Sequence, residues 1–176
     1  KTVARLAMQR SAGARCVTDT VRTPVENSAV FTSPHCQLLY ELGCGQAIRG
    51  VCDLDYINIP DVKKRAASAG NHGSSSAIAD CGSSMAPDIE RIIALNPEAI
   101  LVSPFENSGG YGKLDKLHIP LIEVADYMET SPLGRAEWMK FYGMLFGNEE
   151  GKSNGISGSC EPKADSLFAK IEKEYL

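Results

Sequence analysis

The chain has 176 residues, of which 43% are hydrophobic and 23% are charged, and its formal net charge is -4 at pH 7. This length suits one domain, and this composition supports a buried core and excludes a disordered chain. Acidic and basic residues are interspersed without a Lys/Arg-rich run, so we expect no nucleic-acid partner. No apolar run approaches the roughly 18 residues that a membrane-spanning helix needs.

The N-terminal quarter predicts a β-hairpin and then a strand–helix–strand unit. Residues 3–22 alternate loosely around a turn-forming Ser-Ala-Gly, which is typical of a hairpin. The run AVFTSP (29–34) predicts a short strand, and HCQLLYEL (35–42) is apolar at helical spacing until Gly43 stops it. IRGVCD (48–53) predicts a second strand, so the unit is compact for a parallel crossover.

The clearest helix signal lies in the middle of the chain. IPDVKKR (59–65) predicts a turn of helix, and residues 68–80, rich in Gly, Ser and Asn, predict an exposed, flexible loop. DIERIIAL (88–95) runs at helical period, with Pro87 expected in its first turn, where the missing N–H costs nothing. AILVSP (99–104) then predicts a buried strand.

The remaining sequence repeats the order of helix, turn, apolar strand and polar loop. After the loop FENSGGYG (105–112) come a short helix, KLDKL (113–117), and a strand, PLIEVA (120–125). Residues 131–147 predict a long amphipathic helix. This alternation predicts the α/β class, with a mainly parallel central sheet flanked by helices.

The cysteine pattern leaves the redox state open. Six cysteines without a C-x-x-C pair suggest neither a zinc ribbon nor a thioredoxin-type site, and an even count permits three disulfides in fifteen connectivities. Because Cys36, Cys44 and Cys52 stand in apolar surroundings, we expect them to be small buried core residues.

Four stretches of the sequence carry a resemblance to a known family. AVFTSPHCQLLYELG, IRGV and DCGSSMAPDIERIIALNPEAILVS, followed by KLDKLHIPLIEV, together resemble the helical-backbone (class III) periplasmic substrate-binding proteins of ABC importers for cobalamin, iron–siderophore or haem. The Glu-x-Ile-x-x-Leu-x-Pro segment is the most specific part of the match. The resemblance runs from about Val25 to Phe146, which is most of the chain.

The resemblance implies a three-layer, Rossmann-like lobe. Residues 1–146 would form the N-terminal substrate-binding lobe, 147–162 a flexible linker, and 163–176 the start of the backbone helix that joins two lobes in this family. No second copy of the motif follows, so we expect the second lobe to be absent. The family also implies a periplasmic or cell-surface location, with a lipid anchor in the precursor.

The function that the resemblance implies is transport without catalysis. The chain is expected to capture an iron complex (siderophore or haem) or cobalamin and to deliver it to an ABC permease in the cytoplasmic membrane. No resident cofactor and no metal ligands are expected. By the same resemblance, Glu90 is expected to dock against arginines of the permease; otherwise it is a surface residue that complements a helix dipole.

Ligand contacts are expected at the carboxyl ends of the predicted strands, where open α/β sheets bind ligands. Aromatic faces, a thioether and a few polar groups gather in these loops, a mixture that suits a flat macrocycle or a metal chelate. The candidates are Ser33, Pro34, His35, Ser83, Ser84, Met85, Phe105, Glu106, Tyr111, Tyr127, Met128 and Glu129.

Several of these candidates have simpler structural explanations. The serines suit helix caps, Met85 suits core filling, and His35 suits a hydrogen-bonded structural histidine. Tyr111 stands between glycines on a predicted exposed loop, where its ring is not expected to pack in the core, which favours a role in binding.

Three other functions remain open at the level of sequence. An enzyme is disfavoured, because the sequence has neither a G-x-S-x-G elbow nor a P-loop. A metal-binding or metal-chaperone module would use His35, Cys36 and Cys81, provided that folding brings them together. A sensor domain would keep the lobe and lack transport.

Overall fold

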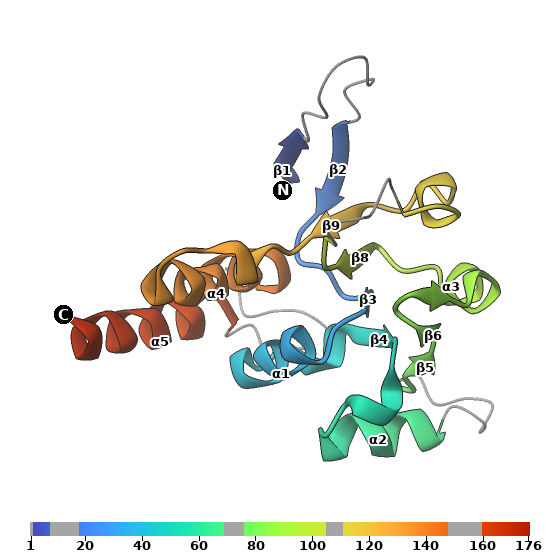
Figure 1. Cartoon of the computed structure of the whole chain (residues 1–176), viewed down its shortest axis with the longest axis horizontal. Helices are drawn as coiled ribbons and strands as arrows, with labels where there is room; N and C mark the ends of the chain where they lie inside the picture. The colour runs from blue at the N-terminus through green and yellow to red at the C-terminus, as the bar shows by residue number, and fades with distance from the viewer. Residues whose placement is uncertain (1, 8–17, 69–75, 105–110, 148–159) are drawn as a thin grey trace.

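The computed structural model describes residues 2–7, 18–68, 76–104, 111–147 and 160–176, with the side chains of residues 2–19 left aside. Five parallel strands form the central sheet, in the order β5-β4-β3-β8-β9 (Figure 1). Their bounds are β3 Ser28–Val30, β4 Ile48–Val51, β5 Ala79–Asp80, β8 Ala99–Val102 and β9 Leu121–Glu123. The predicted parallel α/β sheet is therefore confirmed.

Helices cover both faces of this sheet, which gives the expected three layers. The larger core lies against α1 (Ser33–Leu42), α4 (Pro132–Phe146) and α5 (Cys160–Tyr175). The smaller core lies against α3 (Ile89–Leu95) and the 3-10 helix η4 (Leu114–Lys116). Helix α2 (Pro60–Ala67) adds the buried Val62 to the larger core.

The central strands divide their side chains between the two cores. In β8, Ala99 and Leu101 enter the larger core, whereas Ile100 and Val102 enter the smaller one. Successive side chains of a strand point to opposite faces, so a strand that is buried on both sides is apolar throughout. This explains the unbroken run AILV, all of which is buried.

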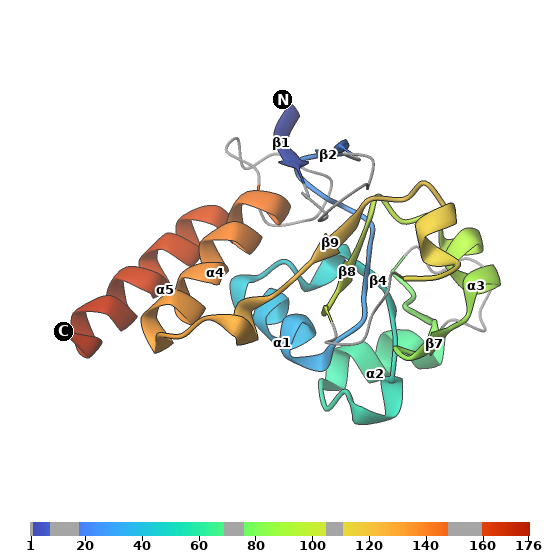
Figure 2. The ribbon, with the colours of Figure 1, turned by 45° about the horizontal axis from the view of Figure 1, so that its top comes forward.

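The predicted N-terminal hairpin is present. Strand β1 (Thr2–Ala7) pairs antiparallel with β2 (Thr18–Arg22). The hairpin lies outside the parallel sheet (Figure 2), and the chain passes from it into β3.

A second, smaller hairpin corrects the predicted start of the central helix. Strands β6 (Gly82–Ser83) and β7 (Ala86–Pro87) pair antiparallel, so Pro87 ends a strand and is not in the first helical turn. The helix begins only at Ile89, because the Asp88 side chain accepts a hydrogen bond of 3.1 Å from the backbone N–H of Arg91. The prediction that Ser83 or Ser84 caps this helix is therefore wrong.

A further strand lies within a predicted loop. Residues 79–80 fall within the predicted Gly/Ser-rich loop, yet they form β5, which pairs in parallel with β4. Residues 69–75 of that loop lie outside the described residues.

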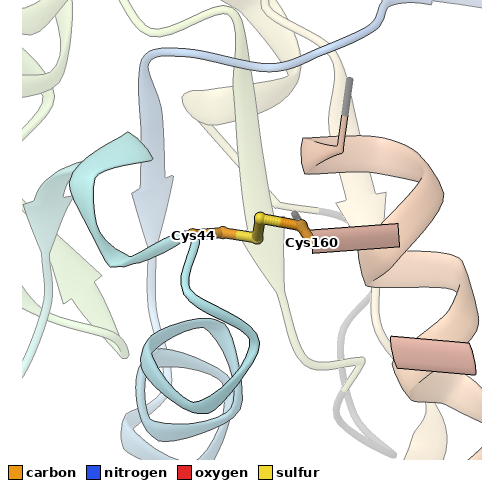
Figure 3. The surroundings of a disulfide bond; sticks show 2 residues. All are labelled: Cys44 and Cys160. Carbon is orange, nitrogen blue, oxygen red and sulfur yellow. A yellow bond between two sulfur atoms is a disulfide. The ribbon is translucent and has the colours of Figure 1, made fainter. Parts of the chain in front are cut away.

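A disulfide joins Cys44 to Cys160 (Figure 3). Cys44 lies just beyond α1, and Cys160 is the first residue of α5, so the bond connects segments that are 116 residues apart. Cys44 is buried as expected, but it is not a free core thiol. Cys36, Cys52 and Cys81 are free and buried.

Helix α5 begins three residues before the predicted 163–176 and packs along α4; the two helices lie side by side in Figures 1 and 2. Gly143 allows this close approach, since a Cβ atom there would lie 2.7 Å from the Cβ of Ala164. Lys140 Nζ lies 3.7 Å from the ring centroid of Phe168. Within the described ranges, no helix combines the length and apolar character that crossing a membrane requires.

Candidate ligand-binding cavity

The strand order creates a crevice between β3 and β8. The chain passes from β3 to β4 on one side and later returns to β8 on the other side of β3. In open α/β sheets, ligands bind outside the carboxyl ends of the strands at such a switch point. Phe31 and Thr32 follow β3 there, and Val102 and Ser103 stand at the end of β8.

A cavity of about 490 Å³ lies at this switch point. As far as the described residues form it, the wall is mainly apolar, with hydroxyl groups and a single ionisable side chain, that of Lys113, besides the phenol of Tyr111. Such a lining binds through large contact area with few directional bonds. The lining residues are Phe31, Thr32, Ser84, Met85, Ala86, Pro87, Ile89, Val102, Ser103, Tyr111, Gly112, Lys113 and Leu114.

Asp53 positions the β6–β7 hairpin that forms one wall of this cavity. Its backbone N–H donates to the carbonyl of Gly82 at 2.7 Å, and its carboxylate accepts from the N–H of Ser84 at 3.1 Å. Asp53 adopts a left-handed conformation (φ 52°), as does Gly82 (φ 81°). The hairpin turn thus presents Met85 at the rim, where its side chain is 76% exposed.

A smaller cavity of about 290 Å³ shares this hairpin wall. It includes Ser33 and Pro34 at the start of α1, together with Ser83 and Tyr56. Tyr56 belongs to the 3-10 helix η2 (Leu54–Tyr56) and is 81% exposed. The two cavities have four lining residues in common: Phe31, Thr32, Ser84 and Met85.

His35 lies beneath this edge and is not among the residues that line either cavity. It is 4% exposed, and its Nδ1 atom is hydrogen-bonded to the hydroxyl of Thr32. Its Nε2 atom lies 3.0 Å from a carboxylate oxygen of Asp126, in the 3-10 helix η5 (Asp126–Met128). The ring of Tyr142, fully buried in α4, stands 5.8 Å from the His35 ring between centroids.

The structure brings half of the predicted contact residues together. Six of the twelve line one or both cavities, namely Ser33, Pro34, Ser83, Ser84, Met85 and Tyr111. Phe105 and Glu106 lie outside the described residues, so their predicted role stays a prediction.

The residues after β9 form a separate part of the rim. Tyr127 and Met128 are 47% and 65% exposed and line neither cavity. The Tyr127 hydroxyl donates to the carbonyl of Pro104, which holds η5 beside the end of β8. Arg135 donates to the carbonyls of Asp126 and Tyr127 at 3.2 and 2.8 Å.

Glu129 faces a third cavity, between β9 and α4. This cavity has a volume of about 490 Å³ and includes Trp138 and Phe141 in its wall. The indole N–H of Trp138 donates to Glu129 at 3.0 Å. Trp138 is partly buried and packs against the larger core.

Thr32, Ser103 and Lys113 were not among the sequence candidates. The sequence does indicate two of them. Thr32 and Ser103 lie within two residues of the end of a strand and within two residues before a proline. Lys113 is brought into the wall only by the fold of the segment around η4, which no local pattern indicates.

The proposed metal-ligand set is not assembled. Cys36 belongs to the larger core and Cys81 to the smaller one, on opposite faces of the sheet. Burial raises the pKa of Cys36 to about 12, and burial, with the nearby Asp80 as a smaller cause, raises that of Cys81 to about 11. Among the described residues, no group of three or more His, Cys, Asp or Glu side chains is arranged to hold a metal ion.

Glu90 is exposed in the first turn of α3. It directly follows Ile89, which lines the larger cavity. The candidate docking residue and the cavity wall are therefore consecutive on one short helix.

Comparisons by sequence identify one distant relative. The chain matches no known protein-family profile. It is 33% identical over 100 residues to an uncharacterized lipoprotein of Methanocaldococcus jannaschii, a match that covers 56% of this chain and 21% of that protein.

Comparisons by structure cover nearly the whole chain. The siderophore-binding protein BauB, bound to acinetobactin and ferric iron, matches with a TM-score of 0.61 and 20% identity over 99% of this chain and 52% of its own. The iron-uptake substrate-binding protein PiuA of Streptococcus pneumoniae matches with a TM-score of 0.60 and 17% identity, over 98% and 51%. The vitamin B12-binding protein BtuF of Vibrio cholerae gives 0.50 and 14%, over 85% and 49%.

These similarities confirm the expected fold. The chain has the fold of one lobe of the class III periplasmic binding proteins, and it spans about half the length of the solved structures that it matches. At identities of 20% and below, the similarity establishes the fold alone, since one fold hosts many functions.

Proposed function

We propose that this chain is the first lobe of the substrate-binding component of an ABC importer. The component would capture an iron complex (siderophore or haem) or cobalamin and deliver it to a membrane permease, without catalysing a reaction. The observation that supports this most directly is the mainly apolar cavity at the β3/β8 switch point.

The exposed side chains at the rim support a large ligand. Met85 and Tyr56 are 76% and 81% exposed beside the cavities, although large apolar side chains are costly to leave in water. A planar macrocycle or a bulky chelate would cover both. Two proteins of similar structure, BauB and BtuF, bind ligands of this kind, namely an acinetobactin–iron complex and vitamin B12.

The proposal includes a second lobe, with α5 as the beginning of the helix that leads to it. From residue 169 onward α5 is exposed, including the apolar Ile171, Tyr175 and Leu176. An exposed apolar stripe on a helix indicates that something packs against it. Closure of a second lobe over the cavity would increase the buried ligand area and hence the affinity.

Glu90 is proposed to dock the lobe on the permease. It is exposed, it lies in a first helical turn, and its neighbour Ile93 is 56% exposed on the same helix. A carboxylate beside an apolar side chain suits an interface with arginines. Glu90→Gln is expected to leave ligand binding unchanged and to slow uptake in cells that carry the matching permease.

An extracytoplasmic location fits two observations. The Cys44–Cys160 disulfide is of the kind that persists in oxidising compartments. The relative from Methanocaldococcus jannaschii is described as a lipoprotein. We propose that the protein works in the periplasm or at the cell surface, lipid-anchored through a precursor segment.

The test is calorimetric titration with cyanocobalamin, haemin and a set of ferric siderophores. We expect saturable binding of one ligand class and at least a tenfold loss in Met85→Ala, because the thioether lines both cavities. Ile93→Ala is the control, since Ile93 is also a largely exposed apolar side chain, at 56%, and lines neither cavity. Absence of binding by this chain and by a form extended through a second lobe would refute the proposal.

A further inference from the structure

Thr32 occupies an unusual position at the base of both cavities. It is the N-cap residue of α1, with an extended backbone (φ -127°, ψ 138°). An N-cap threonine ordinarily accepts a hydrogen bond from a backbone N–H of the first turn. Here the side chain makes no such bond, and the hydroxyl is hydrogen-bonded to Nδ1 of His35.

The partners of His35 fix which of the two groups donates. Nε2 lies 3.0 Å from the Asp126 carboxylate, and an ionised carboxylate only accepts, so Nε2 carries the proton of the neutral ring. Nδ1 is then an acceptor, and the Thr32 hydroxyl donates to it. A hydroxyl has one hydrogen, so towards the cavity Thr32 offers only its lone pairs.

Protonation of His35 reverses this arrangement. Both ring nitrogens of an imidazolium donate, so Nδ1 would donate to the Thr32 oxygen and the hydroxyl hydrogen would turn to the cavity. The groups that face the ring are Thr32, Asp126 of η5 and Tyr142 of α4. Burial raises the pKa of the Tyr142 phenol, so this neighbour stays neutral throughout the relevant range.

We propose that Thr32 is a specificity-determining residue whose hydrogen-bonding polarity is set by His35. With neutral His35 it selects ligands that present an N–H or O–H donor, such as the amide side chains around a corrin ring. With protonated His35 it selects acceptor groups, such as carboxylates or the oxygens of an iron-bound catecholate. This inference rests on the proposed function, because it concerns the ligand cavity of that function.

The first arm of the test needs no ligand. Nitrogen NMR of the imidazole rings, with His35 assigned through His35→Gln, reports which nitrogen carries the proton. We expect the Nε2–H tautomer at pH 8 in the intact chain. The Nδ1–H tautomer would overturn the inference, whatever the chain binds.

The second arm compares two substitutions at Thr32. Thr32→Val keeps the shape and removes the hydroxyl, whereas Thr32→Ser keeps the hydroxyl. At pH 8 we expect Thr32→Val to weaken cyanocobalamin binding about three- to tenfold and Thr32→Ser to change it less than twofold. At pH 5 the same valine substitution should weaken a ferric tricatecholate more than cyanocobalamin.

The outcomes separate this inference from the proposed function. Equal affinities of the intact chain and Thr32→Val for each ligand at both pH values would overturn the role of Thr32 while leaving transport intact. Absence of binding to any probe, both by the intact chain and by a form extended through a second lobe, would refute the proposed function, and the ring spectrum alone would then decide the polarity of Thr32.

Discussion

The two ends of helix α1 stand in contrasting surroundings. At its start, Thr32 and Ser33 border cavities whose rim carries the exposed side chains of Met85 and Tyr56. Beyond its end, Cys44 is fully buried and covalently bound to α5. One helix therefore links the region that we propose contacts a ligand to a region of internal packing.

The contrast indicates how this lobe divides stability from recognition. Among the described residues, the two largest fully buried side chains, Tyr142 and Phe146, lie on the α1–α4–α5 side. Most of the folding free energy should therefore come from this side, where apolar area is removed from water. The cavity rim should be replaceable at little cost in stability, and four changes test this division in order of effect.

Removing the disulfide is expected to have the largest effect. Cys44→Ser with Cys160→Ser opens a loop of 116 residues, and the chain-entropy account of such a loop gives a loss of about 3 to 5 kcal/mol. Urea unfolding of the double variant and of the intact chain measures it. A loss below about 1 kcal/mol would mean that packing alone holds α5.

Filling the α4–α5 contact comes second. In Gly143→Val even the first added atom, Cβ, would lie 2.7 Å from the Cβ of Ala164. Overpacking of this kind costs about 1 to 3 kcal/mol. Gly112→Ala is an instructive control, because its Cβ meets no atom within 4 Å while its φ of 60° strains the backbone. Thermal unfolding of both variants separates crowding from strain.

Raising the pH should weaken the larger core next. Burial raises the pKa of Cys36 from 9.0 to about 12, so above pH 9 the unfolded chain loses a proton that the folded chain retains. Stability is therefore full below pH 9 and falls as the pH rises towards 12, by about 1 kcal/mol at pH 10 from this thiol. Unfolding of Cys36→Ala across pH 7–10 should show a shallower fall; an identical slope would contradict the assignment.

Truncating the cavity rim should cost least. Met85 is 76% exposed, so Met85→Ala is expected to change the free energy of unfolding by less than about 0.5 kcal/mol. Met139→Ala, in which the same side chain is 7% exposed within the larger core, should cost about 2 kcal/mol or more. Similar losses in both variants would abolish the proposed division between the two regions.

Local patterns were sufficient for four of the five strands of the central sheet and for most helices. The run AILV predicts a doubly buried strand, and the helical periods of residues 35–42 and 131–147 match α1 and α4. Strand β5 has only two residues, and it forms because it can pair with the edge of β4. This pairing is a long-range contact, so the local sequence does not indicate it.

The errors share one physical origin, which is long-range contact. Pro87 fits the first turn of a helix by local rules, but hydrogen bonds from Asp53 hold that segment as a hairpin instead. Likewise, the partner of Cys44 lies 116 residues away. The role proposed for Thr32 depends on His35 and on Asp126, which is 91 residues from His35. The sequence therefore indicated where the cavity lies, but not whether its Thr32 hydroxyl donates or accepts a hydrogen bond.

The buried residues of helix α5 all lie between Cys160 and Phe168. This part of the helix holds the disulfide and the buried Ala164 and Phe168, whereas residues 169–176 are exposed; in Figure 2 the helix runs alongside α4. The covalent link to Cys44 therefore joins the start of α5 to the chain just beyond the end of α1. Any body attached beyond Leu176 would be connected through this bond and the α4–α5 contact to α1, whose other end borders the cavities.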